Sequence, residues 1–317
     1  WMAQLVVVGA ACFVSLGWLL PRMLSEAQAQ AAQEGSSGQH RALMREAAAR
    51  ISWVPLYQTL ALEQDVGAIR AALQTGGTQN EEVQSMVEQA LDASKQAVTR
   101  WPHQSDMWLL RASVYSVIAS MAKGADQFAI QAYQEGMARA PQNPLFPLGI
   151  GRIYALRAEE PVPATTSTAE GVAKYRLEQR RLAAQWLKRA REMKSDDATI
   201  TYLYATQLAK AGDIQGALPL LQELVERLPN RLDIQLEYAA LLAAAGRHEE
   251  AIRFVQPMPS THELYTVSRR LLTDWYVVRE AWPEALAAWK QIPAADQQTA
   301  AFRERLNALQ LKAQGSR

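Results

Sequence analysis

Four alanines recur along the chain at a constant interval, and this interval constrains the fold more than any other feature of the sequence. Ala183, Ala217, Ala251 and Ala285 are spaced 34 residues apart. Each has an apolar residue directly after it and another four residues after it. A fixed period of roughly 20–50 residues is typical of proteins built from stacked structural repeats. We therefore expect a repeat array rather than two independent globular domains.

The same register extends toward the N-terminus if two insertions are allowed. Ala90 and Ala129 are 39 residues apart, which is 34 plus 5, and Ala129 and Ala183 are 54 apart, which is 34 plus 20. The insertions fall near 118–125 and 159–180. The second insertion, which includes Glu159 to Thr168, is rich in Pro, Thr and Ser and is predicted to be an exposed loop.

Turn residues at fixed offsets indicate that each repeat is a pair of helices. Pro102, Pro141 and Pro229 each stand twelve residues after a marker alanine, where a proline ends a helix. Gly212 and Gly246 each stand five residues before one, where a glycine separates two helices. Small residues alternate with large ones, as close helix packing requires. The pattern predicts an all-α chain of short antiparallel helix pairs.

The repeats resemble a known family. Trp108, Ala112 and Tyr115, followed by Ala129 and Pro141, follow the tetratricopeptide repeat pattern W-x2-L-G-x2-Y, A-x3-F, P. The resemblance covers roughly Val83 to Ile292. It implies a tetratricopeptide solenoid of about six helix pairs over 53–293, with a C-terminal capping helix and tail at 294–317. The pattern is broken at Ser195, Glu263 and Gln297, where proline is usual, and at Thr273, where a small residue is usual.

The N-terminal segment predicts a membrane anchor. Met2 to Leu20 is apolar and uncharged, and as a helix it would reach roughly 28 Å, enough to cross a bilayer. We expect one transmembrane helix at 1–22 and a helical or flexible linker at 23–52. A cleavable signal peptide, suggested by Ala27-Gln28-Ala29, and a buried core helix remain alternatives. The expected location is the bacterial inner membrane. Arginines after the span favour a cytoplasmic repeat domain.

The composition of the chain disfavours several classes of function. The net charge is +1, which gives no global basic excess and disfavours nucleic-acid binding. One cysteine, Cys12, and four scattered histidines leave no zinc or disulfide framework. No arrangement of a nucleophile, a base and an orienting acid is visible. We expect no catalytic residue, no cofactor and no metal, so the chain is predicted to bind rather than to catalyse.

Two surfaces are candidate binding sites. The repeat register predicts that a partner groove is formed by the first helix of each pair, with Asp106, Leu109, Ser113, Leu148, Arg152, Tyr202, Thr206, Lys210, Leu236, Arg270 and Asp274. A basic patch is predicted on 174–194, with Lys174, Arg176, Arg180, Arg181, Lys188 and Arg189. This patch either docks on acidic lipid or an acidic partner, or is a solvated helix face.

Two functions fit these features. The first is a non-enzymatic, membrane-anchored scaffold that gathers protein partners in a bacterial envelope complex. The second follows from a resemblance of 57–61 and 123–133 to the C-terminal repeats of bacterial O-antigen ligase-like proteins. That resemblance implies that the repeats are attached to a polytopic glycan polymerase with catalytic spans upstream of Trp1. It also implies a repeat domain outside the cytoplasm, which leaves the side of the membrane open and slightly favours the extracytoplasmic side over the one that the arginines indicate.

Overall fold

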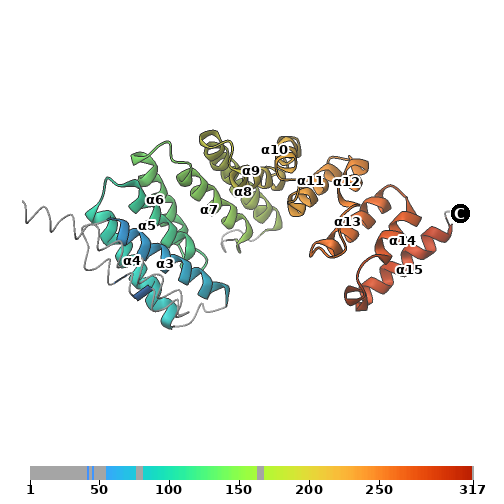
Figure 1. Cartoon of the computed structure of the whole chain (residues 1–317), viewed down its shortest axis with the longest axis horizontal. Helices are drawn as coiled ribbons and strands as arrows, with labels where there is room; N and C mark the ends of the chain where they lie inside the picture. The colour runs from blue at the N-terminus through green and yellow to red at the C-terminus, as the bar shows by residue number, and fades with distance from the viewer. Residues whose placement is uncertain (1–40, 43–44, 46–54, 76–80, 163–167, 316–317) are drawn as a thin grey trace, which may run out of the picture. The chain divides into compact units, whose positions relative to one another are not determined.

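The structure is a computed structural model that describes residues 41–42, 45, 55–75, 81–162 and 168–315 (Figure 1). The described part is all-α, with thirteen α-helices and one 3-10 helix. The predicted membrane segment at 1–22, and all of the predicted linker except 41–42 and 45, lie outside it. Among the described residues, no helix combines the length and the apolar composition that crossing a bilayer requires.

The chain divides into two compact units, Trp1–Gly149 and Ile150–Arg317. The first unit holds α3 (Pro55–Gln74), α4 (Glu81–Arg100), α5 (Ser105–Val117) and α6 (Ala125–Arg139). The division falls within α7 (Leu145–Glu159). Apolar side chains of α3, α4 and α5, including Leu62, Val83 and Met107, form one core in this unit.

The second unit continues with helices of alternating direction. They are α8 (Ala169–Met193), α9 (Ala198–Lys210), α10 (Ile214–Arg227), α11 (Leu232–Ala244), α12 (His248–Val255), α13 (Tyr265–Val278), α14 (Trp282–Lys290), η1 (Ala294–Gln298) and α15 (Ala300–Gly315). Consecutive helices from α8 to α15 pack against each other. A core that includes Leu221, Leu242 and Leu272 runs through α9 to α14.

The predicted register is confirmed by burial. Ala90, Ala129, Ala183, Ala217, Ala251 and Ala285 all have 0% exposed surface. The small residues allow close helix contacts: a Cβ added at Gly136 would lie 2.2 Å from the Phe146 ring, and one at Gly151 would lie 2.8 Å from Cγ of Leu187. Small side chains therefore stand opposite large ones, as the sequence predicted.

The predicted turns are also confirmed. Helices α4, α6 and α10 each end two residues before a proline, at Arg100, Arg139 and Arg227. After α9, Gly212 has a φ of 89°, and the amide of Asp213 donates to the carbonyl of Leu208 at 2.9 Å. Gly246 has a φ of 81° and the same pattern follows it, with Arg247 donating to Leu242. This is the Schellman termination, which favours glycine because its φ is positive.

The second insertion differs from its prediction. We expected an exposed loop, but Ala169 to Met193 forms a 25-residue helix, ten residues longer than α6. The hydroxyl of Thr168 caps it by accepting from the amide of Gly171 at 3.1 Å. Within the described residues, the insertion therefore mainly lengthens the second helix of a pair. The cap and a run of good helix formers override the loop signal of the preceding Pro and Thr residues.

The helix predicted at the C-terminus is present as α15. Phe302, Leu309 and Ala313 are buried at seven- and four-residue spacing, which places them on one face of the helix. The Phe302 ring stacks on Trp289 of α14 with 4.9 Å between centroids. Helix α15 thus covers the apolar side of the last helix pair.

Candidate functional site

The groove residues predicted on the first helices differ widely in accessibility. Asp106, Arg152 and Arg270 are exposed, and Leu109 and Ser113 are half-buried. Leu148 and Leu236 are each only 7% exposed. The prediction that these two leucines face a partner is wrong, since they pack inside the protein. A shift of one residue in register on a helix turns a side chain by about 100°, enough to move it from groove to core.

On α9 and α11, the predicted groove face is occupied by an internal hydrogen bond. The hydroxyl of Tyr202 donates to Oε1 of Glu237 at 2.6 Å, across two neighbouring first helices. Burial, and then the Glu237 carboxylate, raise the pKa of Tyr202, so the hydroxyl remains a donor. Thr206 donates to the backbone carbonyl of Tyr202 at 2.9 Å. Both hydroxyl groups therefore donate within the protein, where they stabilise the predicted groove face, and neither is left as a free donor for a partner.

Ion pairs occupy further groove residues of the second unit. Nζ of Lys210 lies 3.0 Å from Oε1 of Glu159, and Arg180 lies 3.5 Å from the same oxygen. The hydrogen bond from Lys210 is the main reason that the pKa of Glu159 is lowered. Asp274 on α13 pairs with Arg305 on α15 at 2.6 Å. In the second unit, Tyr202, Lys210 and Asp274 of the predicted groove are thus already paired with the protein's own helices.

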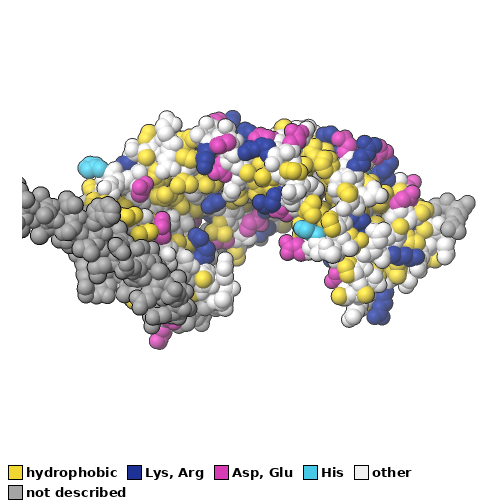
Figure 2. All heavy atoms as spheres, viewed as in Figure 1, with side chains coloured by type: hydrophobic (Ala, Val, Ile, Leu, Met, Phe, Trp, Pro, Cys, Tyr) yellow, Lys and Arg dark blue, Asp and Glu magenta, His cyan; other side chains and the backbone are white. Residues whose placement is uncertain are grey.

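The predicted basic patch separates into different environments on α8. Lys174, Arg181 and Lys188 are exposed at seven-residue spacing and share one face, with Glu178 between the first two. Arg176 and Arg180 are half-buried, and Arg180 donates to the carbonyl of Lys210. Arg189 is exposed, with its guanidinium 5.7 Å from the Trp186 ring centroid. On the face shown in Figure 2, acidic and basic side chains lie next to one another over α8 to α10.

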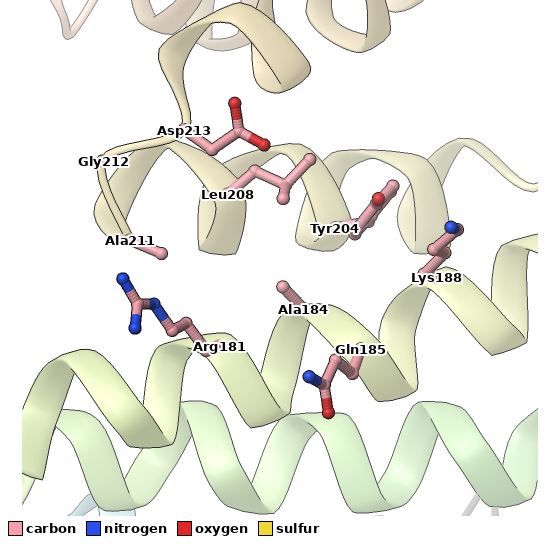
Figure 3. A pocket seen from close by; sticks show the side chains of 9 residues that line it. All are labelled: Arg181, Ala184, Gln185, Lys188, Tyr204, Leu208, Ala211, Gly212 and Asp213. Carbon is pink, nitrogen blue, oxygen red and sulfur yellow. The ribbon is translucent and has the colours of Figure 1, made fainter.

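Two of the exposed cations of α8, Arg181 and Lys188, border a pocket, which we call the α8–α9 pocket (Figure 3). It encloses about 450 Å³ and is lined by Arg181, Ala184, Gln185, Lys188, Tyr204, Leu208, Ala211, Gly212 and Asp213. Ala184 on α8 and Leu208 on α9 lie in its middle part, and Arg181 and Lys188 lie at opposite ends. The pocket therefore combines an apolar centre with a cation at each end.

A second hollow continues the α8–α9 pocket toward α10. It encloses about 360 Å³ and shares Lys188, Tyr204, Leu208 and Asp213 with the first. Burial is the main reason that the pKa of the Tyr204 hydroxyl is raised, so the group stays protonated at neutral pH. The Asp213 carboxylate is used as the cap of α10, accepting from the amide of Gly216 at 2.9 Å. Together the two hollows form a groove along α8.

The α8–α9 pocket lies away from the predicted groove. Tyr204 and Leu208 are each two residues beyond Tyr202 and Thr206, and two residues turn a helix by about 200°. Sequence reasoning named Arg181 and Lys188 but missed the residues that face them. A signal was available in the sequence, because Tyr204 and Leu208 are large residues that flank the small Ala205 shortly before the Gly212 turn.

Within the part of the chain that the structure describes, no group of three or more His, Cys, Asp or Glu side chains is arranged to hold a metal ion.

Comparison with known proteins identifies the repeats. Residues 208–264 match the tetratricopeptide repeat family. The fold is the tetratricopeptide repeat fold. A TPR repeat-containing protein of Cytophaga hutchinsonii matches with a TM-score of 0.55 and 14% identity, covering 88% of this chain and 98% of that one. The TPR protein YrrB, described as having an unusual peptide-binding site, matches with a TM-score of 0.53 and 16% identity, covering 68% and 98%.

A third similar structure is that of pilF from Pseudomonas aeruginosa. It has a TM-score of 0.51 and 15% identity, covering 79% of this chain and 99% of that chain. No curated protein matches the sequence. At these identities the structural likeness defines the tetratricopeptide fold alone. The sequence resemblance to O-antigen ligase-like proteins stays a prediction.

Proposed function

We propose that this chain is a non-enzymatic tetratricopeptide scaffold that binds a protein partner, and that the α8–α9 pocket is a point of contact. The observation that carries the proposal is the pocket itself, in which Arg181 and Lys188 flank the apolar side chains of Ala184 and Leu208. Within the described residues, neither cation has an ion pair of its own. An apolar centre with polar groups at its rim is the usual anatomy of a binding site for a protein segment.

The helices that form the pocket are held firmly in place. Ala183 and Ala205, on the two helices that border it, have no exposed surface, and Asp213 fixes the start of the next helix. A preorganised surface loses less conformational entropy when it binds. The fold neighbour YrrB, described as having a peptide-binding site, supports peptide recognition as a use of this architecture.

The wider setting of the proposal comes from the sequence. We propose that residues 2–20 anchor the scaffold in a bacterial membrane, where the repeats gather partners of an envelope complex. Membrane association is testable by carbonate extraction of cells that produce the full chain. Release of the chain by carbonate would contradict the anchor without affecting the pocket.

Photo-crosslinking tests the contact in cells. Gln185 is exposed, uncharged and lines the pocket, whereas Gln222 is exposed on α10 outside it. With a benzophenone amino acid at each position in turn, we expect one discrete crosslinked partner from 185 and none from 222. Arg181→Glu with Lys188→Glu should abolish that product. Equal crosslinking from both positions, or none from 185, would show that the pocket is not the contact.

A further inference from the structure

A buried arginine on α13 has no anionic partner among the residues that the structure describes. Arg269 is only 4% exposed. Its Nη2 donates to the carbonyls of Val255 at 3.1 Å and Gln256 at 3.0 Å, and its Nη1 donates to Oε1 of Gln291 at 2.9 Å. Nε lies 3.4 Å from the hydroxyl of Ser268. All four acceptors are neutral, and a guanidinium has five N–H groups. One N–H of Nη1 therefore lies outside these contacts.

The charge of Arg269 is only partly balanced. Burial lowers its pKa, and Tyr265 and Tyr276 act in the opposite direction, yet an arginine stays protonated at any physiological pH. The carbonyl end of α12 and the Tyr265 ring, whose centroid is 4.7 Å from the guanidinium, supply partial negative charge. Among the described residues, no carboxylate forms an ion pair with it. A buried cation in this state favours an incoming anion.

A pocket opens beside this guanidinium. It encloses about 570 Å³ between α13, α14 and the segment after α12, and Arg269 is one of its lining residues. Met258 and Leu272 give it an apolar wall. Glu284 and Ala287, both exposed on α14, lie at its rim, and Glu284 is its only acidic lining residue. We call this the α13–α14 pocket.

We propose that the α13–α14 pocket binds a glutamate or aspartate side chain of a partner protein, with the carboxylate on Arg269 and a neighbouring apolar side chain against Met258 and Leu272. That the occupant is a protein segment rests on the proposed function. Charge complementarity selects the acidic side chain, because Arg269 is a charged donor and a charge-assisted hydrogen bond is roughly twice as strong as a neutral one. The apolar wall favours an apolar side chain next to the acidic one in the partner.

Arg269 also has a structural role, since it satisfies two carbonyls at the end of α12. A purely structural arginine and a ligand-binding one differ in a measurable way. Only the second makes the pocket discriminate between an acidic and an amide side chain of the same size. The test therefore compares ligands first and variants second.

The experiment measures binding of rhodamine-labelled Ser-Leu-Glu-Leu-Ser amide to the full chain by fluorescence anisotropy. The control peptide has Gln in place of Glu, and both peptides are blocked at the C-terminus. We expect the Glu peptide to bind about tenfold more tightly. A third peptide, with Gln and a free C-terminal carboxylate, should bind as weakly as the blocked Gln peptide. Equal affinity for all three, or no binding of any, would overturn the proposal, and tight binding of the third alone would assign the pocket to chain termini.

Variants at the exposed rim of the pocket test the proposal without disturbing the buried Arg269, whose replacement could affect folding. Glu284→Gln removes the only acidic side chain that lines the pocket and should raise the affinity for the Glu peptide by about threefold. Ala287→Glu should lower the affinity for the Glu peptide. Ala287→Gln, which introduces a side chain of the same size as Glu, should lower it less. Arg269→Gln should make the affinities for the Glu and Gln peptides equal. If neither rim charge alters the preference for Glu, Arg269 is structural only.

The two proposals can fail separately. Loss of the crosslink at Gln185 would remove the α8–α9 pocket as the contact and leave the peptide preference at Arg269 unchanged. Peptide binding without a preference for Glu would remove the α13–α14 pocket and leave the crosslink.

Discussion

Glu280 occupies, one repeat later, the turn position that Gly246 occupies between α11 and α12. The two residues are 34 apart, with φ values of 57° and 81°. The hydrogen bonds match as well: Arg247 donates to Leu242 at 2.8 Å, and Ala281 donates to Tyr276 at 2.9 Å. The turn between α13 and α14 therefore keeps the Schellman hydrogen bond with a side chain that disfavours its backbone conformation.

Glu280→Gly should stabilise the protein by about 1 kcal/mol, because it relieves the cost of a left-handed φ at a residue with a Cβ. The measurement is the thermal midpoint by circular dichroism. Glu280→Ala is the control, since it removes the carboxylate but keeps the strain. A gain from the alanine variant as large as that from the glycine variant would trace the effect to the side chain instead.

Ala217→Trp should destabilise the repeats by about 1–3 kcal/mol or more, because Ala217 has no exposed surface and the indole has no room. Ala244→Trp on the exposed side of α11 introduces the same side chain outside the core and should cost much less. Denaturant unfolding of both variants provides the comparison. Equal losses would contradict the repeat register.

Asp197→Ala should cost about 1 kcal/mol at neutral pH, because the carboxylate caps α9 by accepting from the amides of Thr199 and Ile200 at 2.9 and 3.1 Å. Asp196→Ala is the neighbouring control, since among the described residues Asp196 contributes only its backbone carbonyl, which accepts from Arg227. Burial acts to raise the pKa of Asp197, but the Ile200 amide and Lys194 outweigh it and the pKa is lowered from 3.8. A lowered folded-state pKa gives stability that is present above 3.8 and is lost as the pH falls through the folded value. The difference between wild type and Asp197→Ala should therefore shrink in acid, and a constant difference would contradict the cap.

Asp65→Asn should change the pH dependence of stability in the opposite sense. Asp65 is 2% exposed and pairs with Arg45 at 2.8 Å, yet burial outweighs that pair and raises its pKa above 3.8. A raised folded-state pKa gives stability that is present below 3.8 and is lost as the pH rises through the folded value. Wild type should thus lose stability relative to Asp65→Asn between pH 4 and pH 7, as followed by thermal melts. A parallel dependence in the two proteins would show that Asp65 is not strained by burial.

Part of the candidate binding surface could be predicted from the sequence, and part could not. The exposure of Arg181 and Lys188 follows from their seven-residue spacing on one helix face. Their position beside Tyr204 and Leu208 does not, because it depends on how α8 and α9 pack. Leu148 and Leu236 were assigned to a groove and are buried, since a general repeat register does not resolve a rotation of about 100° at each helix.

The sequence by itself determined the 34-residue repeat and the positions of the turns between its helices. Alanines at a period of 34 can only mark close helix contacts, and glycine at 212 and 246 supplies the positive φ that each turn requires, so local chemistry and the period suffice. Only the tertiary structure decided which charged side chains already have a partner within the protein. Lys210 and Asp274 pair with groups 51 and 31 residues away, and Arg269 is buried against carbonyls from another helix. These contacts depend on the packing of separate helices, and no spacing along one helix encodes them.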